Sequence, residues 1–139
     1  MYIMPMKSKT RHVVALSETD ATSAIYYSVY LELFDRARVD MYRDASLPIS
    51  LFYNMRAKAA YVEFSRIVKF LDELEILSWF CRLGTTSVKM CHQVLTGGEE
   101  AARGYVVDVY VVGGKPTRIP DDIRAKISSA LDTPEFTAK

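Results

Sequence analysis

The chain has 139 residues, with 18 Lys and Arg against 17 Asp and Glu, so its formal net charge is only +1 at pH 7. This length suits one globular domain, and a nearly neutral chain lacks the basic surface that nucleic-acid binding by bulk charge requires. Half of the residues are hydrophobic, which excludes an intrinsically disordered protein. We therefore expect a single domain over residues 1–139.

The few cysteines and histidines argue against a zinc site. The chain contains only Cys81, Cys91, His12 and His92, scattered without the spacing of metal ligands. Both cysteines lie among apolar residues, so we expect free, half-buried thiols in a reducing compartment, with a disulfide as the less favoured alternative. No apolar run has the length of a signal peptide or a membrane span, which predicts a cytoplasmic location.

The first part of the chain predicts a strand followed by a long helix. Apolar and β-branched residues at 12–17 indicate a short strand. The polar stretch 18–23 ends this strand and offers Thr22 or Ser23 as a helix N-cap. Apolar residues then recur at intervals of three and four, which predicts one amphipathic helix over 24–44.

After this helix the pattern becomes that of a sheet. Pro48 breaks the helix, and residues 49–56 are expected to form a loop or a short helix. Alternating apolar residues and tight glycine turns then indicate an antiparallel meander. Four strands are predicted, at 57–69, 74–83, 87–95 and 101–112. A short helix follows at 120–131, and the ends of the chain, 1–10 and 132–139, are expected to be flexible.

These elements predict an α+β domain in which a curved antiparallel sheet of about five strands wraps around one long central helix. The helix needs a large apolar surface to lie on, and only the strands can provide it. No internal repeat or interdomain linker interrupts the chain.

Asp20 is the main candidate for a catalytic residue, because it lies just before the long helix. A carboxylate there can cap a turn, or it can use the unpaired amides and the dipole at the start of the helix for chemistry. From the residues alone the capping role is favoured. Glu18, two residues earlier, would raise the pKa of Asp20 if both faced one way, but a solvated edge position is favoured for it.

Several segments follow one another in the order of a known family. They are Ser17-Glu18-Thr19-Asp20-Ala21, Ile25-Tyr26-Tyr27, Tyr30-Leu31, Phe34-Asp35-Arg36-Ala37-Arg38, residues 70–76 and residues 114–120. Together they resemble the hotdog-fold acyl-CoA thioesterases of the 4-hydroxybenzoyl-CoA thioesterase type, over about residues 12–131. Many relatives carry glycine where this chain has Thr22 and Ser23.

The resemblance implies a fold, an assembly and roles for two residues. The implied hotdog fold is a long helix wrapped by an antiparallel sheet, with acyl-CoA sites between the subunits of a homodimer or of a homotetramer built as a dimer of dimers. Asp20 would be the nucleophile or the general base, and the backbone N–H of Tyr27 would bind the oxyanion. The resemblance implies no metal, and no cofactor besides the coenzyme A of the substrate.

Further candidates for substrate contacts come from the helix, the strands and the loops. Tyr26, Tyr30 and Phe34 can line an acyl pocket, although their spacing is also that of core residues. Ser87 resembles a small hydroxyl position near the family's active site. The candidates for binding the phosphates of coenzyme A, with solvated surface charges as the alternative, are Lys69, Lys89 and Arg118.

The predicted function is hydrolysis of an acyl-CoA thioester with an aryl or medium-chain acyl group. The thiolate that leaves has a conjugate acid with a pKa of about 8.5, so a single carboxylate and an oxyanion donor can suffice. One alternative is hydrolysis of thioesters on acyl carrier protein in a fatty acid or polyketide pathway. The other is a non-catalytic hotdog module that binds acyl thioesters. Neither nucleic acid nor a membrane span is expected.

Overall fold

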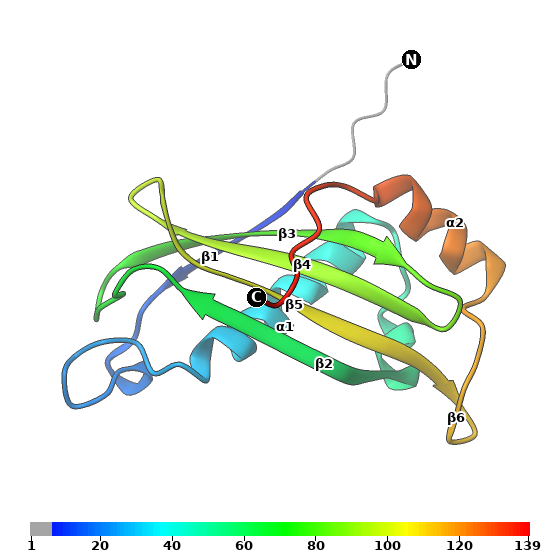
Figure 1. Ribbon diagram of the computed structural model, residues 1–139, viewed down its shortest axis with the longest axis horizontal. Coiled ribbons are helices and arrows are strands. Elements are labelled where there is room, and N and C mark those ends of the chain that lie inside the picture. Colours follow the sequence, from blue (N-terminus) through cyan, green and yellow to red (C-terminus); the bar gives the residue numbers. More distant parts are fainter. Residues whose placement is uncertain (1–6) are drawn as a thin grey trace, which may run out of the picture.

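One antiparallel sheet wraps around a long helix in the computed structural model, which describes residues 7–139 (Figure 1). The strands are β1 (Ser8–Val13), β2 (Met55–Phe64), β3 (Glu73–Leu83), β4 (Ser87–Thr96), β5 (Glu99–Val112) and β6 (Lys115–Pro116). Their order is β1-β3-β4-β5-β2, and β6 pairs with the end of β5. The predicted α+β class and the wrapped helix are therefore confirmed.

Helix α1 (Val29–Asp44) forms because one of its faces is apolar and the sheet can bury that face. Complete burial of one large apolar side chain contributes roughly 1.5–3 kcal/mol. Ser46 adopts a left-handed φ of 58° just past the helix, and Pro48 follows, so the helix cannot continue. The buried residues of α1 are Val29, Tyr30, Leu33, Phe34, Ala37, Met41 and Tyr42.

The start of α1 lies five residues later than predicted, because the preceding backbone is engaged elsewhere. The amide of Ile25 donates a hydrogen bond to the carbonyl of Val68 at 2.7 Å, which holds the chain extended beside the β2–β3 connection. Ser28, rather than Thr22 or Ser23, occupies the N-cap position. The amphipathic spacing extends through this segment, but tertiary pairing overrides it.

Two shorter helical segments follow α1 in the chain. The six-residue 3₁₀ helix η2 (Ile49–Asn54) confirms the predicted loop or short helix, and α2 (Asp121–Ala130) confirms the helix predicted near the C-terminus. No helix within residues 7–139 is long and apolar enough to cross a membrane.

Strand boundaries also differ from those predicted. β1 begins at Ser8, inside the segment 1–10 that was expected to be flexible, while residues 1–6 lie outside the described part of the chain. β2 ends at Phe64 instead of Lys69, since its last pair with β5 is there. The residues beyond β2 leave the sheet and form a wall of the cavity described below.

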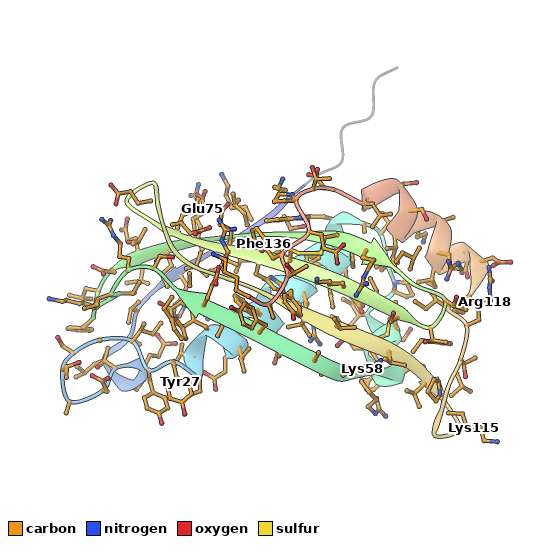
Figure 2. All side chains as sticks on the ribbon, in the orientation of Figure 1. Tyr27, Lys58, Glu75, Lys115, Arg118 and Phe136 are labelled. Atoms are coloured by element: carbon orange, nitrogen blue, oxygen red, sulfur yellow. A yellow bond between two sulfur atoms is a disulfide. The ribbon has the colours of Figure 1, made fainter. Side chains whose placement is uncertain are left out.

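The C-terminal segment lies across the outer face of the sheet, opposite α1, in place of the expected frayed tail (Figure 1). Trp79 donates its indole N–H to the carbonyl of Pro134 at 2.8 Å, and the ring of Phe136 packs edge-on against it. Lys89 is buried beneath the segment and forms an ion pair with Glu135 at 2.9 Å. Phe136 lies over the middle of the sheet (Figure 2).

The two cysteines form a disulfide between β3 and β4, so the prediction of free thiols is wrong. Cys91 pairs with Trp79 in the ladder, and a register shift after Phe80 leaves Cys81 in a bulge. The Cα atoms are 6.0 Å apart, a separation that a disulfide spans. Linear sequence could not reveal this proximity, because it depends on the pairing of the strands.

Replacement of Gly104 by Ala should destabilise the fold. A Cβ atom at this β5 position would overlap the carbonyl oxygen of Tyr61 and approach the ring of Phe34 to 3.0 Å. We expect Gly104→Ala to lower the free energy of unfolding by about 1–3 kcal/mol in urea titrations. Gly84→Ala is the control, since its Cβ would meet mainly the movable side chain of Ser87. Equal effects of both substitutions would contradict this account.

Candidate active site

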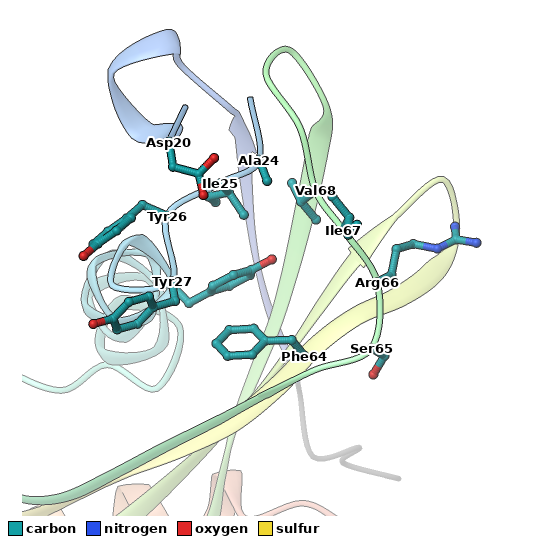
Figure 3. Close-up of a pocket in the computed structure, with 11 residues that line it drawn as sticks. Asp20, Ala24, Ile25, Tyr26, Tyr27, Phe64, Ser65, Arg66, Ile67 and Val68 are labelled. Carbon is teal, nitrogen blue, oxygen red and sulfur yellow. The ribbon is translucent and has the colours of Figure 1, made fainter. Parts of the chain in front are cut away.

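A cavity of about 660 Å³ opens beside the start of α1 (Figure 3). One wall comes from residues 20–30 and the other from residues 64–68, at the end of β2 and in the connection to β3. Its volume is within the range of small-molecule sites, about 300–1,000 Å³. The cavity therefore lies where an exposed loop, a helix terminus and a strand end meet.

Aromatic side chains dominate the lining. The rings of Tyr26 and Tyr27 have centroids 4.8 Å apart, and those of Tyr30 and Phe64 are separated by 5.3 Å. Burial raises the pKa of Tyr30 to about 12, so its phenol is neutral at physiological pH. Four rings around one cavity create a surface for a flat or apolar group.

Asp20 contributes a carboxylate to the same cavity. Its Oδ1 accepts hydrogen bonds from the hydroxyl of Thr22 at 2.6 Å and from the amide of Thr22 at 2.8 Å. These bonds hold the pKa of Asp20 below its ordinary value, with the hydroxyl as the larger cause. The carboxylate is consequently ionised at neutral pH, and both bonds from Thr22 go to Oδ1 rather than to Oδ2.

The loop that carries Asp20 is a tight turn. The amide of Asp20 donates to the carbonyl of Ala24 at 2.9 Å, and the amide of Ser23 donates back to the carbonyl of Asp20 at 3.0 Å. Ser23 has a φ of 65°, a left-handed conformation that costs a residue with a side chain roughly 1–2 kcal/mol. The turn explains why glycine suits this position, and contacts elsewhere in the structure must offset the strain.

Two backbone amides at the start of α1 are free to bind an anion. Within residues 7–139, the N–H groups of Tyr27 and Ser28 have no hydrogen-bond partner, whereas that of Val29 donates to Tyr26. The positive end of the dipole of this 16-residue helix lies here as well. The family resemblance implied the amide of Tyr27, whereas the amide of Ser28 was not predicted because the helix was expected to begin earlier.

The predicted substrate residues are only partly brought together. Tyr26 and Tyr30 line the cavity, whereas Phe34 is buried in the core and stacks on His92 with ring centroids 4.3 Å apart. Ser87 lies toward the other end of the sheet. It pairs with Val109 of β5, seven residues beyond the partner of Phe64, a distance of roughly 24 Å at about 3.4 Å per residue.

Of the three predicted cations, only one lies near the cavity. Lys69 forms a β-bridge with Ala24, which is part of the cavity wall. Lys89 is engaged with the C-terminal segment, and Arg118 pairs with Asp121 at the end of the molecule far from Tyr27 (Figure 2).

Arg66 is a cation that sequence analysis did not identify. It lines the cavity from the β2–β3 connection and forms an ion pair with Glu99 of the β4–β5 hairpin. A position just after the alternating residues of a strand predicts a ligand-binding arginine only weakly, since many surface arginines share it. No cluster of His, Cys, Asp and Glu able to hold a metal occurs in the described residues.

A family model matches most of the chain. Residues 14–127 match the family model of the thioesterase-like superfamily. No curated protein matches the chain.

Solved structures are similar over most of the chain. A thioesterase from Thermus thermophilus, in complex with coenzyme A and Zn, is 28% identical over 86% of this chain and 96% of its own, with a TM-score of 0.78. A hypothetical protein, also from Thermus thermophilus, is 26% identical over 87% and 97%, with a TM-score of 0.81. A predicted thioesterase from Bacillus stearothermophilus is 22% identical over 94% and 100%, with a TM-score of 0.84.

Removal of the Thr22 hydroxyl should move the titration of Asp20. Because the hydrogen bond from this hydroxyl stabilises the ionised carboxylate, Thr22→Ala should raise the pKa of Asp20 toward its ordinary value. Carbon-13 NMR of the side-chain carboxyl measures the change directly. Thr19→Ala is the matched control, since its hydroxyl donates to the carbonyl of Leu16, and it should leave the titration of Asp20 in place.

Proposed function

The chain belongs to the thioesterase-like superfamily and adopts the α+β hotdog fold, and from this premise we propose that it hydrolyses acyl-CoA thioesters with an aryl or medium-chain acyl group. Thioester hydrolysis in general follows from the family. The observation that supports the finer proposal is that an ionised carboxylate, the free amide of Tyr27 and four aromatic rings surround one cavity, with the free amide of Ser28 next in the chain.

Asp20 initiates the reaction in this proposal. Its carboxylate either attacks the thioester carbon or removes a proton from a water molecule that attacks it. The carbonyl oxygen becomes an oxyanion, which accepts hydrogen bonds from the amides of Tyr27 and Ser28. The C–S bond then breaks and coenzyme A leaves as a thiolate. After direct attack, water hydrolyses the mixed anhydride on Asp20 and releases the acid.

The two ends of the substrate contact different parts of the site in this proposal. The rings of Tyr26, Tyr30 and Phe64 hold the acyl group, and a flat aryl group uses their faces best. Arg66 and Lys69, in the connection beside the cavity, are the cations best situated for the phosphates of coenzyme A. The Thermus thermophilus thioesterase, whose structure contains coenzyme A, supports this substrate class.

A homodimer, alone or paired into a tetramer, completes the site in our proposal. β2 is an edge strand with an unpaired side, and such edges invite pairing with another chain. Large apolar side chains stand exposed around the cavity next to this edge: 64% of Tyr27, 52% of Phe64 and 71% of Ile67 are accessible in one chain. Contact with a second subunit would cover them.

The decisive test is thioester hydrolysis by wild-type protein and by Asp20→Asn. Thiol release from aryl, short, medium and long acyl-CoAs, and from acyl carrier protein, identifies the substrate. We expect aryl-CoA to be turned over best, and kcat to fall at least ~100-fold in Asp20→Asn because the carboxylate acts in the transition state. Asp44→Asn, at the exposed end of α1, is the matched control.

We propose that no metal takes part in the reaction, so dialysis of the protein against EDTA should preserve the rate.

Three outcomes separate the alternatives. Full activity of Asp20→Asn would contradict the proposed mechanism. Turnover confined to carrier-protein thioesters would replace the substrate class. Saturable binding of acyl-CoA without turnover by the wild-type protein would indicate a binding module.

In a single turnover with ¹⁸O-water, label in Asp20 would indicate the nucleophilic route.

The oligomeric state can be measured separately from the activity. Sedimentation equilibrium should give a mass of two or four chains, because the exposed apolar rim and the free strand edge are unfavourable in water. A monomer with full activity at assay concentration would contradict a site shared between subunits.

A further inference from the structure

We propose that His12, Glu18 and Arg36 form a positioning triad that holds the Asp20 loop and the free amide of Tyr27 in place. The inference rests on the proposed function and adds three residues that do not touch the cavity. They come from three elements: β1, the 3₁₀ helix η1 (Leu16–Glu18) and α1. Glu18 was expected at a solvated edge, yet its side chain is only 19% exposed.

The hydrogen-bond directions within the triad follow from chemistry. Arg36 Nη1 lies 3.0 Å from His12 Nδ1, and a guanidinium can only donate, so Nδ1 accepts. Nε2 is therefore the ring nitrogen that carries a proton, and it donates to Glu18 Oε1 at 2.7 Å. The same oxygen accepts the amide of Ala15, also at 2.7 Å.

The charge of Glu18 is stabilised by these partners. Burial by itself would raise the pKa of Glu18, but the hydrogen bonds from Ala15 and His12 and the positive charge of Arg36 hold it below the ordinary value. The carboxylate thus links β1 and α1 to the backbone just before the Asp20 loop.

Glu18 connects to both parts of the reaction site through its own backbone. Its carbonyl accepts the amide of Tyr26 at 2.8 Å, directly before the free amide of Tyr27. Two residues after Glu18 comes Asp20, whose amide continues the same short ladder by donating to Ala24. A displacement of Glu18 would therefore shift the carboxylate and the oxyanion donor together.

Backbone hydrogen bonds tie the second half of the loop to the β2–β3 connection: the amide of Ile25 donates to the carbonyl of Val68 at 2.7 Å, and the amide of Phe70 donates to the carbonyl of Ser23 at 3.1 Å. Between residues 15 and 28 only Ile25 is buried, so apolar packing contributes little. Ser23 is in a strained conformation that an unanchored loop would relax. The Glu18 side chain ties the first half of the loop to His12 of β1 and to the amide of Ala15, so this polar anchor and the backbone bonds of the second half together keep Asp20 and Tyr27 in a fixed relation.

The test combines kinetics with amide exchange. Glu18→Ala should lower kcat by ~100-fold with KM changed less than ~3-fold, because a misplacement of about 1 Å at the reacting groups has effects of this size. His12→Leu should lower kcat by ~10-fold. His12→Gln should restore most of the rate, because its amide nitrogen can replace Nε2 as the donor to Glu18. The amide of Tyr26 should exchange at least ~10-fold faster in Glu18→Ala.

Glu73→Gln is the matched control, because this acid lines a second cavity together with His12 and is paired with Val13 of β1 rather than with the loop. It should change neither kcat nor exchange. Wild-type kcat and wild-type exchange in Glu18→Ala would overturn the triad even if Asp20→Asn is inactive. If the wild-type protein hydrolyses no thioester, faster exchange at Tyr26 in Glu18→Ala still supports the triad as the anchor of the loop, and only the proposed function fails.

Discussion

Burial of one face of α1 against the sheet is the constraint on which the rest of this structure depends. Leu33, Phe34 and Ala37 are completely inaccessible, and the ring of Phe34 reaches the sheet where Gly104 has no side chain. A helix held so closely cannot turn or slide without opening the core. Its N-terminus is therefore fixed beside the end of β2, and the free amides, the aromatic rings and the cavity all derive from that placement.

A charged pair is buried beneath the same helix. Arg38 of α1 lies 3.7 Å from the carboxylate of Asp108 on β5, and burial raises the pKa of this acid, although Arg38 opposes the effect. Such a pair adds little net stability because both ions lose hydration. It does disfavour other positions of the helix, in which Asp108 would be buried without this cation. Apolar packing thus provides the stability, while polar groups restrict where the helix can lie.

The two faces of the sheet pack against different parts of the chain. The inner face carries α1 and borders the cavity, whereas the outer face carries the C-terminal segment, with the disulfide, Trp79 and Lys89 beneath it. Phe136 donates its amide to the sulfur of Cys91, so the segment and the disulfide support one another. Lys89 was predicted from the sequence to bind phosphate. It pairs instead with Glu135 on the outer face of the sheet and faces away from α1.

The sequence by itself determined the α+β class, the long amphipathic helix, the glycine turns and the motif around Asp20, because each depends on periodicity or on residues close together in the chain. Tertiary structure alone decided where α1 begins, since the carbonyl of Val68 captures the amide of Ile25. It also joined Cys81 to Cys91, separated Ser87 and Arg118 from the cavity, and placed Glu18 between His12 and the Asp20 loop. These features depend on contacts between distant segments, and no local pattern encodes the distance between two strands or the direction in which a side chain finds its partner.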